Sequence, residues 1–253
     1  MLFKNGPGGR EMRLAIFDID GTLTETNSVD SFCFVQAMTD AHSVVGMSTN
    51  WGAYAHTTDS FITSEILREH FGRPPDGEEL SRFRTRFVRL LEEQRAKDGS
   101  LFAEIGGAGV ALERLRREPG WALAVASGCW RASGMMKLRA AGLGLGGAPA
   151  AFAEDGLSRE EILLAAVARA REVYGEESFE RVVSLGDGLW DVRAARNLGL
   201  AFVGVARGAR ARRLRRAGAS HVVEDFKDYG RLMRCLTAAE IPREEAPNPP
   251  PTQ

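Results

Sequence analysis

Six short apolar runs recur along the chain, and segments with the apolar spacing of helices lie between most of them. The runs cover residues 14–17, 121–126, 150–152, 181–185, 200–205 and 221–223. Helical spacing is clearest over residues 131–141, 159–174 and 191–198. Short apolar strands that alternate with helices indicate a parallel sheet with helices on both faces. The sequence therefore predicts an α/β fold.

One long interval between the first two runs lacks strand alternation. Residues 26–106 have a helical or irregular pattern, and the strongest helical spacing covers residues 80–97. An insertion of this size after the first strand predicts a separate small α-helical domain, which we interpret as a cap. The predicted division is a discontinuous core of residues 13–25 and 107–239, a helical cap of residues 26–106, and flexible termini of residues 1–12 and 240–253.

Composition restricts the expected partners and compartment. The 253 residues include 33 basic and 34 acidic ones, and a net charge of −1 gives no general attraction for nucleic acid or an anionic membrane. The three cysteines lie far apart, which fits a reduced compartment, and no apolar run reaches the roughly 18 residues of a membrane helix. We therefore expect a cytoplasmic protein with no nucleic-acid or membrane partner. The sequence leaves the oligomeric state open.

The first apolar run is followed by two acidic residues, Asp18 and Asp20, and then by Gly21. Residues i and i+2 of a strand lie on the same side, so both carboxylates are expected at the carboxyl end of the sheet, where α/β folds bind ligands. Two adjacent carboxylates at that edge need a bound cation to offset their negative charge. The alternative is a hairpin, because Asp-Gly after an apolar run is also a turn signal.

A second acidic turn follows the run at 181–185. Gly186 and Gly188 flank Asp187, which is expected at the same edge of the sheet as Asp18. Asp191 comes one turn later, and a role as a helix cap is as good an interpretation for it as a role in the site.

Two more strand ends carry groups that suit an anion. Ser127 and Gly128 follow the run at 121–126, and a hydroxyl with a backbone N–H at a helix N-terminus can hold an anion. Ser158 can cap the helix at 159–174, which places Arg159 in its first turn, where a cation opposes the helix dipole. An anionic ligand would explain this arginine, and a solvated surface arginine is the alternative.

Taken in order, these four elements resemble the motifs of the haloacid dehalogenase (HAD) superfamily, in its phosphatase branch with a helical cap inserted after the first strand. The first motif is DxDGT at residues 18–22, and the fourth is GDGxxD at residues 186–191. Ser127 supplies the second motif and Arg159 the third. The third motif is more usually lysine, so Lys137 is a second candidate for that position. The resemblance covers residues 13–229 and implies a Rossmann-like core of the phosphoglycolate-phosphatase type.

This resemblance implies a Mg²⁺-dependent phosphatase that acts on a small phosphorylated metabolite. Asp18 would be the nucleophile and form an aspartyl-phosphate, and Asp20 would be the general acid and base. The metal would be held by Asp18, the backbone carbonyl of Asp20 and Asp187, with Asp191 supporting the metal shell. Three groups at strand ends would hold the phosphoryl oxygens: Ser127, Gly128 and Arg159.

Two other functions stay open. A phosphomutase of the β-phosphoglucomutase type would share Asp18 and Asp20. A phospho-acceptor or binding module could use the same acidic pocket without turnover.

A separate basic cluster lies at residues 207–216. We interpret it as a solvated helix face rather than an RNA-binding site, because Ala211 and Leu214 leave one side of that helix apolar.

Overall fold

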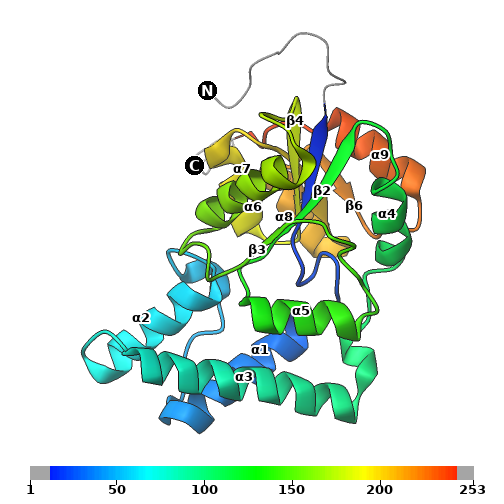
Figure 1. Ribbon diagram of the computed structural model, residues 1–253. Coiled ribbons are helices and arrows are strands. Elements are labelled where there is room, and N and C mark those ends of the chain that lie inside the picture. The colour runs from blue at the N-terminus through cyan, green and yellow to red at the C-terminus, as the bar shows by residue number, and fades with distance from the viewer. Residues whose placement is uncertain (1–11, 244–253) are drawn as a thin grey trace, which may run out of the picture.

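A six-stranded sheet lies at the centre of the computed structural model, which describes residues 12–243 (Figure 1). The strand order is β3-β2-β1-β4-β5-β6, and each neighbouring pair is parallel. The strands are β1 (Arg13–Phe17), β2 (Trp121–Ala126), β3 (Ala150–Ala151), β4 (Arg181–Gly186), β5 (Ala201–Val205) and β6 (His221–Val223). Both ends of each strand lie within one residue of the ends of the corresponding predicted run. The structure therefore confirms the α/β fold class.

Helices cover both faces of the sheet, because successive side chains of a strand point to opposite sides. In β1, Ala15 and Phe17 belong to the hydrophobic cluster of one face, and Leu14 and Ile16 belong to that of the other. The first face is covered by α4 (Ala108–Leu115) and α9 (Tyr229–Ala238). The second face is covered by α6 (Arg159–Tyr174), α7 (Leu189–Leu198) and α8 (Gly208–Arg216).

A further layer of helices lies beyond the carboxyl ends of the strands (Figure 1). Its elements are α1 (Asn27–His42), η1 (Trp51–Ala53), α2 (Asp59–Phe71), α3 (Gly77–Lys97) and η2 (Gly99–Phe102). Phe34, Phe83 and Phe87 fill its centre with edge and stacked ring contacts. The helix α5 (Arg131–Ala140) packs against this layer, because Trp130 and Met136 belong to the same hydrophobic cluster. The helical layer predicted after the first strand is therefore present.

Two chain segments that run side by side connect this layer to the sheet. Thr24 and Glu104 pair as an antiparallel bridge. The backbone N–H of Glu25 donates to the carbonyl of Ala103 at 2.9 Å. The chain therefore leaves the sheet and returns to it at one place, on either side of this helical layer.

The end of the described chain is attached to the core. Residues 240–243 were expected in a flexible tail, but the N–H of Phe202 donates to the carbonyl of Glu240 at 3.1 Å, and Arg196 Nε donates to the carbonyl of Pro242 at 3.2 Å. The rest of the termini predicted to be flexible, residues 1–11 and 244–253, lies outside the described residues. Among residues 12–243, no helix combines the length and the apolar character needed to span a membrane.

Candidate active site

Three neighbouring strands bring the predicted acidic and hydroxyl residues to one edge of the sheet. Because β1 pairs in parallel with both β2 and β4, the residues that follow these strands lie near one another. Asp18 follows β1, Ser127 follows β2 and Asp187 follows β4. The N–H of Asp18 donates to the carbonyl of Leu185 at 3.0 Å, which continues the pairing of β1 with β4 up to the site.

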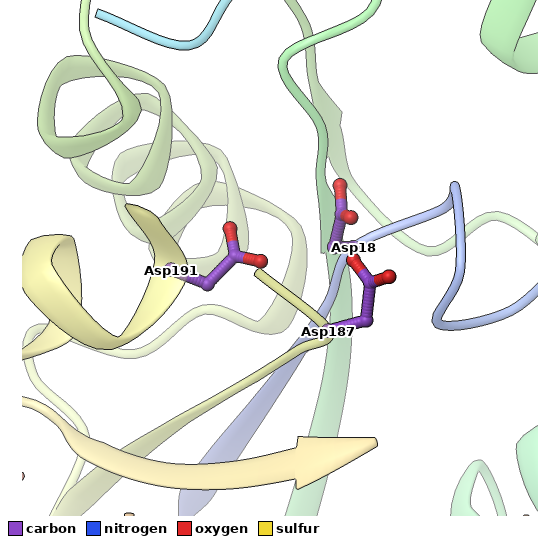
Figure 2. Close-up of side chains that lie close together, drawn as sticks. All are labelled: Asp18, Asp187 and Asp191. Carbon is purple, nitrogen blue, oxygen red and sulfur yellow. The ribbon is translucent and has the colours of Figure 1, made fainter. Parts of the chain in front are cut away.

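Asp18, Asp187 and Asp191 form an acidic cluster (Figure 2). One carboxylate oxygen from each residue lies within 4.8 Å of the other two. Asp18 and Asp187 extend from the strand ends, and Asp191 approaches them from the first turn of α7. Asp191 Oδ2 also accepts a hydrogen bond from the N–H of Gly188 at 3.0 Å. Asp191 therefore makes a contact at the start of α7 and also lies beside Asp18 and Asp187, while its role in the metal shell stays a prediction.

Negative charge is crowded and buried in the acidic cluster. Burial raises the pKa of Asp187 to about 8, and the neighbouring Asp191 and Asp18 carboxylates add to this shift. Burial also raises the pKa of Asp191 to about 7, against the opposing effect of Arg159. Converging carboxylate oxygens are the ligands that Mg²⁺ prefers. The acidic cluster therefore fits a divalent cation, which would compensate the crowded charge.

Arg159 lies beside the acidic cluster at the start of α6. Its guanidinium donates to Asp18 Oδ1 at 3.1 Å and lies 3.6 Å from Asp191 Oδ1. The arginine side chain is only 12% exposed, so the alternative of a solvated surface arginine does not hold. Ser158 caps α6 and forms a capping box with Glu161, which starts the helix at Arg159. The capped start of α6 therefore directs the Arg159 guanidinium toward Asp18, the predicted nucleophile.

Lys137, the second candidate for the third motif, contacts a different pair of acids. Its Nζ lies 2.8 and 2.7 Å from the two carboxylate oxygens of Asp20, and it also donates to Asp30. Burial alone lowers the pKa of Lys137, but the Asp20 and Asp30 carboxylates outweigh this effect and raise the pKa well above the ordinary lysine value. The fully buried Lys137 side chain therefore neutralises Asp20 and Asp30, whereas Arg159 contacts Asp18.

Asp20 lies in the tight turn after β1 and is not one of the three residues of the acidic cluster. Gly21 has a φ of +74°, in the left-handed region that favours glycine. A Cβ atom at this position would also lie 2.1 Å from Asp187 Oδ2. The hydroxyl of Thr26 donates to Asp20 Oδ1 at 2.5 Å. Thr26 and Lys137 therefore fix the position of the Asp20 carboxylate.

Ser127 and Gly128 line a small pocket of about 90 Å³, together with Arg159 and Asp20. Ser127 Oγ accepts a long hydrogen bond of 3.4 Å from the N–H of Cys129. A Cβ atom at Gly128 would lie 2.9 Å from the guanidinium carbon of Arg159, so glycine leaves the space that the arginine needs. A hydroxyl, a guanidinium and a carboxyl group thus meet in one pocket, which suits a phosphoryl group.

Sequence reasoning missed three side chains that reach the site from the predicted cap: Asn27, Asp30 and Asp59. Asn27 Nδ2 donates to Asp187 Oδ2 at 2.8 Å. Asp59 accepts a hydrogen bond from the N–H of Trp130 at 3.0 Å, and burial raises its pKa well above the usual range. Asn27 and Asp30 open the helix just after the first motif, and this position could have indicated them. The placement of Asp59 depends on how α2 packs, which the sequence does not reveal.

Comparison with known proteins relates the chain to hydrolases. The family model for haloacid dehalogenase-like hydrolases matches residues 12–199. "Putative phosphatase YhcW" of Bacillus subtilis (strain 168) is 29% identical over 89 residues, which are 35% of this chain and 40% of that relative.

Solved structures share the fold at low sequence identity. A hydrolase from Pseudomonas syringae is 21% identical with a TM-score of 0.64, over 87% of this chain and 97% of its own. CbbY from Rhodobacter sphaeroides, in complex with phosphate, is 21% identical with a TM-score of 0.62, over 87% of this chain and 96% of its own. A predicted phosphoglycolate phosphatase from Haemophilus somnus 129PT is 16% identical with a TM-score of 0.59, over 88% of this chain and 98% of its own.

Proposed function

The chain belongs to the haloacid dehalogenase-like hydrolases, and we propose that it is a Mg²⁺-dependent phosphatase that hydrolyses a small phosphorylated metabolite through an aspartyl-phosphate. One observation carries the proposal: Asp18 lies beside the largely buried Arg159 and close to two further carboxylates at the carboxyl edge of the sheet. This arrangement pairs a nucleophile with a group that attracts phosphate and with ligands for a cation. The relatives named as phosphatases add support.

Asp18 is the nucleophile in this proposal. A carboxylate oxygen of Asp18 attacks phosphorus, the bond from phosphorus to the ester oxygen breaks, and Asp20 gives its proton to the leaving oxygen. In the second step a water molecule attacks phosphorus, Asp20 takes a proton from the water, and the bond from phosphorus to the Asp18 oxygen breaks. Phosphate then leaves, and the Asp18 carboxylate is restored.

The phosphoryl oxygens are held by Ser127, Gly128 and Arg159. The Ser127 hydroxyl and the Gly128 N–H follow β2, and the Arg159 guanidinium reaches the same pocket from α6. Charge-assisted hydrogen bonds from arginine to phosphate are about twice as strong as neutral ones, so Arg159 supplies most of the attraction. Its contact with Asp18 also orients the nucleophile before substrate arrives.

Mg²⁺ would be held by Asp18, Asp187 and the backbone carbonyl of Asp20, with Asp191 supporting this shell. When bound, the ion offsets the negative charge that builds up on the phosphate and the carboxylates. Asn27 and Gly188 orient the ligands, since Asn27 donates to Asp187 and the Gly188 N–H donates to Asp191.

The predicted division of the chain is part of the proposal. A core of residues 13–25 and 107–239 would carry the motifs, and a cap of residues 26–106 would close the site against water. The small pocket supports this arrangement, because Thr57 and Asp59 of the cap line it together with Ser127 and Gly128 of the core.

Phosphate release from an aryl phosphate and from sugar phosphates, with Mg²⁺ or with EDTA, tests the proposal. The variant Asp18→Asn is expected to lose roughly a thousand-fold or more in kcat, because the amide cannot attack phosphorus. Asp40→Asn is the matched control, since Asp40 pairs with Arg86 in the cap and does not line the small pocket. Full activity of Asp18→Asn, or of the wild type in EDTA, would refute the proposal.

The same assay separates the other two candidate functions. A phosphomutase would convert one sugar phosphate into an isomer, and phosphorus NMR of the products would show that isomer instead of free phosphate. A phospho-acceptor or binding module would release at most one phosphate per chain. Steady release over many turnovers is the result expected for a phosphatase.

A further inference from the structure

A large groove opens beside the acidic cluster, between the helical layer of residues 26–106 and the core. Its volume is about 880 Å³, nearly ten times that of the small phosphoryl pocket. The cap contributes residues of α1 and η1, and the core contributes the turn at Asp187 with α7 and α8. Asn27, Ser31, Trp51 and Trp190 are shared by the groove and the small pocket. The two spaces are therefore neighbours and share part of their walls.

Three arginines line this groove, and we call them the arginine cluster: Arg193 of α7 with Arg210 and Arg213 of α8. All three side chains are exposed. Within residues 12–243, the side chains of Arg193 and Arg213 form no ion pair or hydrogen bond. Arg210 lies 3.6 Å from Asp187 Oδ2, and Asp187 is the groove's one acidic lining residue among those described. The groove is therefore positive in a chain whose net charge is −1.

The arginine cluster is more specific than a solvated helix face. Arg210 and Arg213 are three residues apart, so they lie on one side of α8, while Ala211 and Leu214 are buried against the core. Arg193 belongs to a different helix that lines the same groove. A solvated face of α8 explains Arg212, Arg215 and Arg216, but it does not explain why a second helix adds a further arginine, Arg193, at this place.

We propose that the arginine cluster binds a second anionic group of the substrate, a phosphate or a carboxylate, while the first phosphate lies at Asp18. The inference rests on the proposed function and narrows it to phosphomonoesters with two anionic ends. Guanidinium groups bind both kinds of anion through paired hydrogen bonds. Asn27, Ser28 and Ser31 line the groove on the cap side and offer hydrogen bonds to hydroxyl groups along the substrate.

Matched substrate pairs test this inference. One arm compares α,ω-alkanediol bisphosphates of three to six carbons with hydroxyalkyl monophosphates of equal length. A second arm uses ω-carboxyalkyl phosphates, which distinguish a carboxylate from a phosphate as the second anion. For wild type, kcat/KM is expected to be about tenfold or more higher for the doubly anionic member at the best length, mainly through a lower KM.

Substitutions then assign the preference to the arginine cluster. In Arg193→Ala/Arg213→Ala, the ratio of kcat/KM between the paired substrates is expected to fall about tenfold, toward one. Arg212→Ala/Arg215→Ala removes two arginines of α8 that do not line the groove, and this control should keep the wild-type ratio. Thermal unfolding of both variants checks that they fold.

The outcomes separate the two proposals. Wild type that hydrolyses both members of every pair equally well would overturn the inference and leave the phosphatase proposal intact. The inference would also fail if the double variant at Arg193 and Arg213 kept the wild-type ratio. Wild type that releases phosphate from none of these compounds, nor from the aryl phosphate, would overturn the proposed function and the inference with it.

Discussion

Lys137 is a fully buried lysine whose ammonium group contacts the carboxylates of Asp20 and Asp30. A buried ion pair gives little net stability, but removal of one partner leaves uncompensated charge in the interior. Lys137→Met is therefore expected to lower the free energy of unfolding by about 3–5 kcal/mol. Urea denaturation measures this change. Lys97→Met, at an exposed position of α3, should have little effect.

A double variant distinguishes charge from packing at Lys137. If uncompensated carboxylates cause the loss, Lys137→Met/Asp30→Asn should recover part of it, because one of the two buried anions is then neutral. If the single and double variants were equally stable, the loss of stability would instead come from the lost packing of the lysine stem, not from uncompensated charge.

Arg159 offers a second test with single residues. Lysine keeps the positive charge but cannot reproduce the paired contacts with Asp18 and Asp191, so Arg159→Lys should retain part of the activity. Arg159→Ala should lose roughly a hundred-fold or more in kcat/KM for phosphate esters. Steady-state kinetics with an aryl phosphate measure both variants, and Arg139→Ala, at an exposed position of α5, is the control. An Arg159→Ala enzyme of normal activity would exclude the proposed phosphate contact.

Residue positions could be predicted from the sequence where a strand end defines them. Asp18 and Asp187 follow adjacent parallel strands, and Arg159 follows a helix cap, so the order of motifs was enough to expect them near one another. The contact of Lys137 with Asp20 was not predictable in the same way. It depends on the rotation of α5 about its axis and on the packing of α1, which places Asp30 beside it.

At the scale of elements, α5 joins the sheet to the cap helices. Trp130, just before α5, contacts Phe83 and Phe87 of α3 with ring centroids 5.7 and 6.1 Å apart. Trp130 Nε1 also donates to Ser60 at the start of α2 at 2.9 Å. One side chain therefore packs against two cap helices, and the cap is attached at α5 as well as at its two chain connections.

Trp130→Ala should reveal this attachment. Removal of a fully buried aromatic side chain leaves a cavity, and the free energy of unfolding is expected to fall by about 3–5 kcal/mol. Hydrogen exchange should increase most in α2 and α3, which lose their contacts with the Trp130 side chain. Leu164→Ala, at a partly exposed position of α6, is the control with little expected effect. Uniformly faster exchange in all helices would contradict a local role.

Element boundaries were predictable to different degrees. The strands could be located because they are short and mostly apolar, and α6 begins at a capping box that the sequence displays. The cap was predicted as helical, but the bounds of α1 and α2 were not. Their apolar residues face other cap helices and α5 at once, so no single apolar stripe marks either helix.

On the scale of the whole molecule, the cap rests on the core at the active-site edge. Thr58 Oγ1 donates to the carbonyl of Leu157 at 2.9 Å, and Ser60 Oγ donates to the carbonyl of Ala153 at 2.8 Å. The N–H of Asp59 donates to the carbonyl of Gly128 at 2.7 Å. These contacts cover the phosphoryl pocket from the cap side, whereas the groove beside Asp187 is larger and holds the arginine cluster. The shape of the site therefore favours a substrate that extends from the pocket into the groove.

The stability of the whole molecule should depend on a cation in the acidic cluster. Three carboxylates within 4.8 Å repel one another, so Mg²⁺ bound only to the folded state should raise the free energy of unfolding by about 2.7 kcal/mol at one hundred times its Kd. Asp187→Asn removes one of the charges, and it should stabilise the metal-free protein while losing most of the Mg²⁺ effect. Thermal unfolding with Mg²⁺ and with EDTA measures both quantities, and Asp228→Asn, at the exposed N-cap of α9, is the control that should keep the full Mg²⁺ shift. If Asp187→Asn responded to Mg²⁺ as wild type does, the cation would bind elsewhere, and the acidic cluster would be excluded as the metal site.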